Sequence, residues 1–171
     1  MDFMKLAKER FSVRKFMDKP VEQEKLDVIL EAGRVAPTAH NNQPQKIYVL
    51  QSEEALAKIN GLCRCIFGAK TVLMITNDKN LEWQNPLEEG VYAGVEDVSI
   101  VATHMMLAAW ELGIGSCWVN YFAPSGIVKA FNLPDNEQLV LLLPLGYAAE
   151  GATPAPLHDA YHDLKEMVQY L

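Results

Sequence analysis

The sequence predicts an α+β fold, in which helices pack on a sheet without regular alternation of strand and helix. Apolar residues recur at helical spacing over the long segment 91–112, whereas β-branched and apolar residues form a short run over 71–76. The two kinds of segment do not alternate as they would in a parallel βαβ fold. At 171 residues the chain has the length of one domain, 1–171, and we expect about 151–171 to form an extended arm.

Three helices are expected in the first half of the chain. A short one covers 2–9, and apolar residues at helical spacing mark a second over 22–35. Pro37 ends the second helix, because a proline disfavours helical backbone in the residue before it. Ser52 begins the third, since its hydroxyl can accept a backbone amide of the first turn.

Strands are predicted where apolar and β-branched residues lie between turn-forming residues. They are 46–50, 71–76, 116–119 and 139–143. A polar loop around Trp83 follows the second strand, over 78–90, and a helix over 125–131 precedes the last strand.

The longest helix is predicted over 91–112, and Gly113 ends it. Its apolar stripe consists of Val91, Val95, Val98, Ala102, Met105, Ala109 and Leu112. The second half is apolar on its other sides too, which fits either a partner subunit or burial within one chain. Asp97, His104 and Glu111 share a polar stripe, but neighbours lie about 10 Å apart along the axis, too far to bind one metal ion. We expect them to be polar groups with hydrogen-bond partners.

Composition excludes several classes of protein. The net charge of −7 argues against nucleic-acid binding. No apolar run approaches the length needed to span a bilayer, and we expect no signal peptide. The three cysteines, Cys63, Cys65 and Cys117, form neither a disulfide framework nor a paired metal motif. We expect a cytoplasmic protein that contacts no membrane or nucleic acid and holds no metal.

The first 20 residues carry six basic side chains against three acidic ones, unlike the acidic remainder. Within them, Arg10, Ser12 and Arg14 alternate, so an extended backbone would project all three to one side. Guanidinium groups bind phosphate with paired donors, and a hydroxyl can complete the set. The pattern predicts a site for a small anion such as phosphate, although these cations could also belong to a solvated helix.

The loop between Pro37 and Pro44 contains three consecutive amide side chains, 41–43. Amides both donate and accept hydrogen bonds, which suits ligands that present both functions. Amide-rich turns are also common without a ligand, so the loop alone leaves both interpretations open. The sequence contains no dinucleotide-binding glycine motif after a strand, no P-loop and no hydrolase nucleophile motif.

Four segments, in the same order along the chain, resemble the small nitroreductase-like FMN-dependent oxidoreductase family. The first two are R-x-S-x-R-K-F over 10–16 and A-P-T-x-x-N-x-Q-P over 36–44. The others are L-A-A-x-x-L-G-I-G-S-C-W over 107–118 and L-G-Y-x-x-E over 145–150. Because the order is kept from residue 10 to residue 150, the resemblance covers nearly the whole chain.

The resemblance implies a mainly antiparallel sheet packed with helices and a homodimer with FMN at two sites in the subunit interface. It also implies that the C-terminal arm is exchanged between the subunits. Arg10 and Ser12 would hold the FMN phosphate and ribityl chain, and Arg14 would lie beside N1/O2 of the ring, where positive charge favours reduction. The other implied cofactor-binding residues are Pro37, Thr38, Asn41 and Gln43 from the neighbouring subunit, and Trp118 and Val119 near N5, with backbone donors at 118–120.

The implied activity is hydride transfer from NADH or NADPH to flavin N5, followed by reduction of a nitroaromatic, quinone or similar electron-poor compound in a ping-pong cycle. Because the flavin performs the redox step, we assign no catalytic side chain. Two alternatives stay open: a module that stores or senses FMN without turnover, and thiol chemistry, for which no activating base can be identified.

The chain departs from the family pattern in several places. Many members carry basic residues in the arm, where this chain has Pro154-Ala155-Pro156-Leu157-His158 with only the imidazole of His158 to compensate. Gln45 stands where many members have Trp. Arg64 could supply a cation that some members place before the second strand, and Trp83 could act as an aromatic lid or simply pack.

Overall fold

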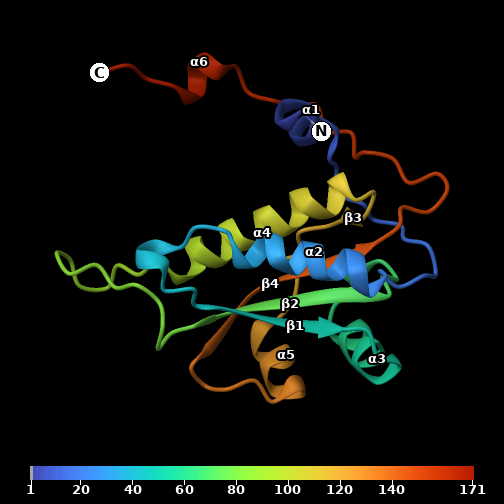
Figure 1. Ribbon diagram of the computed structural model, residues 1–171, viewed down its shortest axis with the longest axis horizontal. Coiled ribbons are helices and arrows are strands. Elements are labelled where there is room, and N and C mark those ends of the chain that lie inside the picture. The colour runs from blue at the N-terminus through green and yellow to red at the C-terminus, as the bar shows by residue number, and fades with distance from the viewer. Residues whose placement is uncertain (1) are drawn as a thin grey trace.

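The computed structural model describes residues 2–171 and contains a four-stranded antiparallel sheet with helices on both faces (Figure 1). The strands are β1 (Gln45–Leu50), β2 (Thr71–Asp78), β3 (Gly115–Ser116) and β4 (Glu137–Gly146). Their order in the sheet is β1-β2-β4-β3, and every neighbouring pair is antiparallel. The prediction of an α+β fold is confirmed.

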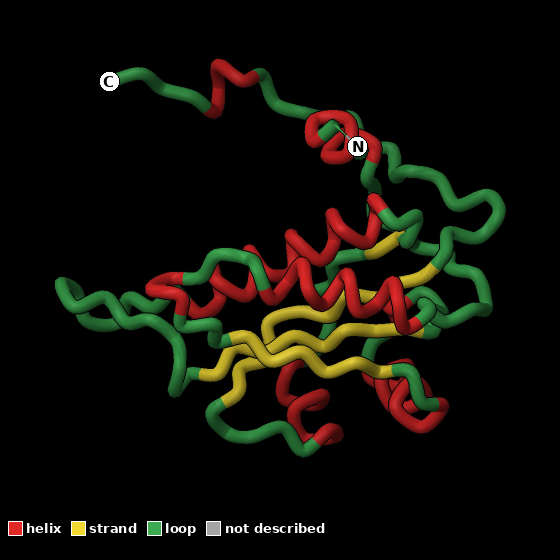
Figure 2. Tube along the Cα trace, viewed as in Figure 1, coloured by secondary structure: helices red, strands yellow, loops and turns green. Residues whose placement is uncertain are grey.

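Helices cover both faces of the sheet, as Figure 2 shows. They are α1 (Phe3–Glu9), α2 (Gln23–Arg34), α3 (Glu53–Leu62), α4 (Gly94–Glu111), α5 (Pro124–Phe131) and α6 (Leu164–Met167). Helices α2 and α4 cover one face, and α3 and α5 cover the other (Figure 1). Ser52 caps α3 as predicted, because its hydroxyl accepts the amide of Ala55.

Two hydrophobic cores form because successive side chains of a strand point to opposite faces. On β2, Leu73 and Ile75 pack with α2 and α4, whereas Val72 and Met74 pack with α3 and α5. A β-bulge changes this pattern on β4, where Ile75 pairs with Leu141 but Thr76 pairs with Leu139. Because both faces of the sheet are buried, the residues of β2 form a continuous apolar run in the sequence. This run is why the strand could be predicted from sequence alone.

Helix α4 begins at Gly94, three residues later than predicted. Gln84 pairs with Tyr92, and the amide of Ala93 donates to the carbonyl of Trp83, so the preceding residues are held in a hairpin-like loop. Four of the seven residues in the predicted stripe are buried. They are Val98, Ala102, Met105 and Ala109.

The predicted strand 116–119 is shorter in the structure. Strand β3 comprises Gly115 and Ser116, and Val119 forms one further bridge to Leu142. Ser12 pairs in parallel with Ser116, so the N-terminal segment occupies the outer edge of β3.

The last residues form an extended arm that runs past α1 and away from the sheet (Figure 1). Residues 159–171 are exposed throughout, and α6 is the one helical turn among them. Among residues 2–171, no helix combines the length and apolar character that crossing a bilayer requires.

Candidate functional site

Side chains of the N-terminal segment line a cavity of about 270 Å³. Its walls are formed by Arg10, Phe11, Ser12, Arg14, Ala155, Leu157 and His158. The structure therefore brings the two arginines and the serine together, as their alternation predicted. The last three wall residues come from the C-terminal arm.

Backbone hydrogen bonds keep this segment extended at the edge of the sheet. The amide of Val13 donates to the carbonyl of Ser116 over 2.9 Å, and the amide of Met17 donates to the carbonyl of Tyr147 over 2.8 Å. Val13 is fully buried. Because side chains alternate along an extended backbone, Ser12 and Arg14 lie on the side away from the core.

A glycine permits the close approach of the two backbones. A Cβ at Gly115 would lie 2.5 Å from Cγ2 of Val13, so any side chain there would displace the N-terminal segment. The hydroxyl of Ser116, paired in register with Ser12, is buried and has no hydrogen-bond partner among residues 2–171.

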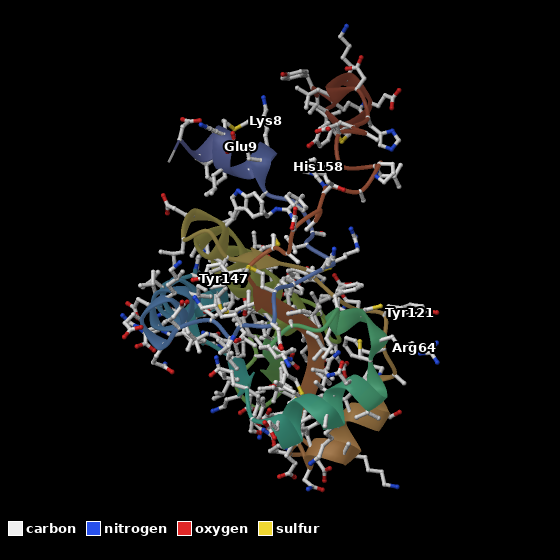
Figure 3. All side chains as sticks on the ribbon, turned by 90° about the vertical axis from the view of Figure 1, so that its right-hand side faces the viewer. Lys8, Glu9, Arg64, Tyr121, Tyr147 and His158 are labelled. Atoms are coloured by element: carbon white, nitrogen blue, oxygen red, sulfur yellow. The ribbon has the colours of Figure 1, made fainter. Side chains whose placement is uncertain are left out.

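His158 connects the arm to this cavity. Its Nε2 lies 3.1 Å from the carbonyl oxygen of Lys8, and since a carbonyl only accepts, Nε2 donates. The imidazole also meets the ring of Phe11 edge-to-face, with 6.3 Å between centroids. Figure 3 shows His158 beside Lys8 and Glu9 at the end of α1.

The donors at the cavity fit a phosphate group. Two guanidinium groups, a hydroxyl and an imidazole lie on its walls, and none of the lining residues is acidic. Such a set offers paired charge-assisted hydrogen bonds to an oxyanion. FMN carries a phosphate of this kind, so the residues fit the phosphate end of that cofactor.

The cysteines lack the features of reactive thiols. Burial raises the pKa of Cys63, and burial raises that of Cys117 despite the opposing charge of Arg14 and the Ser12 side chain. Reactive cysteines have a lowered pKa, because the thiolate is the nucleophile. The structure therefore does not favour nucleophilic chemistry at Cys63 or Cys117.

The amide loop has an unusual backbone. His40, Asn41 and Gln43 have φ values of 56°, 56° and 50°, in the left-handed region that side chains other than glycine seldom adopt. The amide of Gln43 donates to Oγ1 of Thr38 over 3.1 Å, and Nε2 of Gln43 donates to Oδ1 of Asn41 over 3.0 Å. Pro37, Asn41 and Gln43 are exposed, so they are accessible to a ligand or a second chain.

Asp97 of α4 is hydrogen-bonded to this loop. Its Oδ1 accepts the amide of Ala39 over 2.7 Å, and Asp97 as a residue is 2% exposed. Burial raises the pKa of Asp97, and the Ala39 hydrogen bond opposes that effect. We expected the polar stripe of α4 to be fully hydrogen-bonded, which is wrong for two atoms: Oδ2 of Asp97 and Nδ1 of His104 have no partner among residues 2–171.

The segment 10–14, which lines the first cavity (hereafter the cationic cavity), and the loop 37–44 (hereafter the amide loop) lie at opposite ends of α4 (Figure 1). Ala39 is bonded to Asp97 near the first turn, whereas Phe11 packs edge-to-face on Trp110 in the last turn, with 5.2 Å between centroids. The 13 residues from Asp97 to Trp110 correspond to about 20 Å of helix. Within one chain, the two groups of predicted site residues do not meet.

The segment from Trp118 to Asn120 is fixed by hydrogen bonds. The amide and carbonyl of Val119 both pair with Leu142 at 3.0 Å, so the Val119 amide is not available to a ligand. Nε1 of Trp118 donates to Oδ1 of Asn120, and Nδ2 of Asn120 donates to the carbonyl of Val140 over 2.7 Å. The amides of Trp118 and Asn120 remain as candidate donors to a ring.

Arg64 lies outside the cationic cavity. It begins the 3₁₀ helix η2 (Arg64–Ile66) before β2 and lines a second cavity, of about 440 Å³. Trp83 is half-buried in the loop before α4. Neither residue joins the predicted phosphate site in this chain.

The fold is an α+β domain with an antiparallel sheet, and its R-x-S-x-R segment lines a cavity. The chain belongs to the nitroreductase family, because the Nitroreductase family model matches residues 7–67 and 61–147. The resemblance found in the sequence is thereby confirmed at the level of the family.

Individual proteins agree with this assignment. A crystal structure of a nitroreductase family protein from Clostridium difficile 630 is 38% identical, with a TM-score of 0.92, and covers 99% of this chain and 98% of its own. An FMN-dependent nitroreductase from Clostridium difficile R20291 is 28% identical, with a TM-score of 0.78, and covers 98% of each chain. A relative from Methanothermobacter thermautotrophicus, named as an NADH dehydrogenase or NAD(P)H nitroreductase, is 31% identical over 93% of this chain and 84% of its own length.

Proposed function

We propose that this protein is an FMN-dependent NAD(P)H oxidoreductase that reduces nitroaromatic, quinone or similar electron-poor compounds. The observation that carries the proposal is the convergence of Arg10, Ser12 and Arg14 on one acid-free cavity. Family membership supports it, and so does the FMN-dependent relative. When bound, FMN supplies two-electron chemistry between a nicotinamide donor and an acceptor.

The residues of the chain bind and orient the cofactor. Arg10 and Ser12 hold the phosphate and ribityl chain, and His158 of the arm lines the same cavity. Arg14 brings positive charge toward the ring, which makes reduction more favourable. Trp118 and Asn120 offer backbone amides to its polar edge, on a segment that the Val119–Leu142 bridge keeps in place.

We propose that the complete site needs two copies of the chain. The amide loop and the cationic cavity lie about 20 Å apart along α4, so one copy cannot place both on the same ring. A twofold axis across α4 would bring the Asp97 end of one helix toward the Trp110 end of the other. Pro37, Thr38, Asn41 and Gln43 would then reach the cofactor held by the partner.

The visible spectrum of the purified protein, with flavin counted per chain, tests the proposal. Anaerobic NADH or NADPH should bleach the flavin absorbance, and a nitroaromatic or a quinone should restore it. Arg14→Ala should weaken FMN retention and lower the reduction potential of the flavin. A protein that neither contains FMN nor binds added FMN would contradict the proposal.

A flavin-binding module without turnover is the second candidate. The observation that favours it is the arm, which contributes an imidazole where many members of the family have permanent cations. This candidate predicts a yellow protein whose flavin stays oxidised under both nicotinamide donors.

A further inference from the structure

The second cavity has walls of a different character from the first. Its lining consists of Leu62, Cys63, Arg64, Asn120, Tyr121, Phe122 and Ala123. Apart from Asn120 and the single cation of Arg64, these side chains are apolar or aromatic. A cavity of about 440 Å³ lies within the range of small-molecule sites, of roughly 300–1,000 Å³.

Arg64 is an unpaired cation at the edge of this cavity. Its side chain is exposed and forms no ion pair with any described residue, although the whole chain carries a net charge of −7. Tyr121 is 87% exposed, so its ring is open to solvent beside the cavity. Figure 3 shows Arg64 and Tyr121 together at one edge of the molecule.

Hydrogen bonds fix the backbone of the walls and the side chain of Asn120 before any ligand arrives. The thiol of Cys63 lies 3.7 Å from the carbonyl oxygen of Tyr121 and ties the two segments together. The amide of Phe122 donates to the carbonyl of Asn120 over 3.0 Å, and both ends of the Asn120 side chain are hydrogen-bonded. A backbone that is already fixed loses less conformational entropy when a ligand binds.

We infer that this cavity binds small aromatic anions, in which the ring lies against Tyr121 and Phe122 and a carboxylate pairs with Arg64. A guanidinium group can bind a carboxylate with two parallel hydrogen bonds, and aromatic walls favour a planar ring. The inference rests on the proposed function, because Asn120 belongs both to this wall and to the segment proposed to face the flavin. The cavity would then admit electron acceptors that carry a negative charge, such as nitroaromatic carboxylates.

Two matched acceptors test the inference. 4-Nitrobenzoate and 4-nitrobenzamide have the same nitro group and ring, but only the first is an anion. Arg64→Gln should lower the ratio of kcat/KM for the benzoate over the benzamide about tenfold, mainly through KM, since a hydrogen-bonded charge pair is lost. The same ratio in Arg64→Lys should lie between those of the unaltered protein and Arg64→Gln, because lysine keeps the charge but not the paired donors.

The control is Arg34→Gln, which removes an exposed arginine paired with Glu31 on α2, outside both cavities. It should leave the ratio unchanged. A ratio in Arg64→Gln within twofold of the unaltered protein, or an equal fall in the control, would overturn the inference.

A binding measurement separates this inference from the proposed function. Calorimetric titration of 4-nitrobenzoate into the purified protein, without NADH or NADPH, reads the contribution of Arg64 even if no turnover occurs. Binding that weakens about tenfold in Arg64→Gln, but not in Arg34→Gln, supports the site whatever the activity. Equal binding to both variants would refute it.

Discussion

Asp97 illustrates how much of a residue's role depends on the fold. From sequence it is one member of a polar stripe on a long helix, and nothing there indicates which group it contacts. In the structure its carboxylate accepts the amide of Ala39, which lies 58 residues earlier in the chain. It thereby holds the amide loop, in which three residues have left-handed backbone. A preorganised loop of this kind is a common feature of binding sites.

Removal of the Asp97 carboxylate should loosen the amide loop. Asp97→Ala leaves the Ala39 amide without its acceptor, at a cost of about 1–3 kcal/mol in the free energy of unfolding. FMN should also bind more weakly, because the loop no longer holds Thr38 and Asn41 in place. Urea unfolding and FMN titration measure the two effects, and an unchanged FMN affinity would show that the loop does not depend on Asp97.

The ionisation of Asp97 gives a pH-dependent signature. Its pKa is raised above the ordinary 3.8, chiefly by burial, so the folded protein binds the proton more tightly than the unfolded chain. The resulting stability is present below about pH 4 and is lost as the pH rises through the raised pKa. The free energy of unfolding of the unaltered protein, minus that of Asp97→Asn, should therefore fall as the pH rises. A difference that stays flat or increases would contradict this assignment.

Other residues could be read from sequence more directly. Arg10, Ser12 and Arg14 are close in the chain, so an extended backbone is enough to bring them together, and the structure does so. His158 is distant, and its place at the same cavity depends on the path of the arm.

At the scale of elements, the long segments with a strong apolar pattern were predicted most accurately from the sequence. Helix α4 and strand β2 were predicted with small errors at their ends, because each buries a continuous set of apolar residues. Strand β3 is two residues long, and its position depends on pairs formed with β4 and with Ser12. Such short elements are fixed by distant partners, which local patterns do not reveal.

A substitution at Gly115 tests the close contact between β3 and the N-terminal segment at Val13. Gly115→Ala places a Cβ against Val13, and this overpacking should lower the free energy of unfolding by about 1–3 kcal/mol. The shift of the N-terminal segment should also weaken FMN binding. The double variant Gly115→Ala/Val13→Ala should recover part of both losses, because the smaller side chain removes the contact.

The control for this experiment is Gly61→Ala in α3, where a Cβ meets no atom within 4 Å. It should not destabilise the protein, since alanine favours a helix over glycine. If the double variant were no better than Gly115→Ala alone, the close contact would not be the cause of the loss.

At the scale of the whole molecule, one chain does not bring the two groups of predicted site residues together. One end of α4 carries the cations and the other end carries the amide loop. The sequence motifs contain both groups but do not reveal the distance between them, so our proposal of a site shared by two copies depends on the fold.

Complementation between two defective chains tests this account most directly. Arg10→Ala impairs the cationic cavity, and Thr38→Ala/Asn41→Ala impairs the loop, so each variant alone should retain little FMN. If every site combines the cavity of one chain with the loop of the other, the purified mixed dimer contains one intact site and one site with both defects. We predict that flavin rises to one per mixed dimer. A mixed dimer that retains no more FMN than the separate variants would contradict a site shared between two chains.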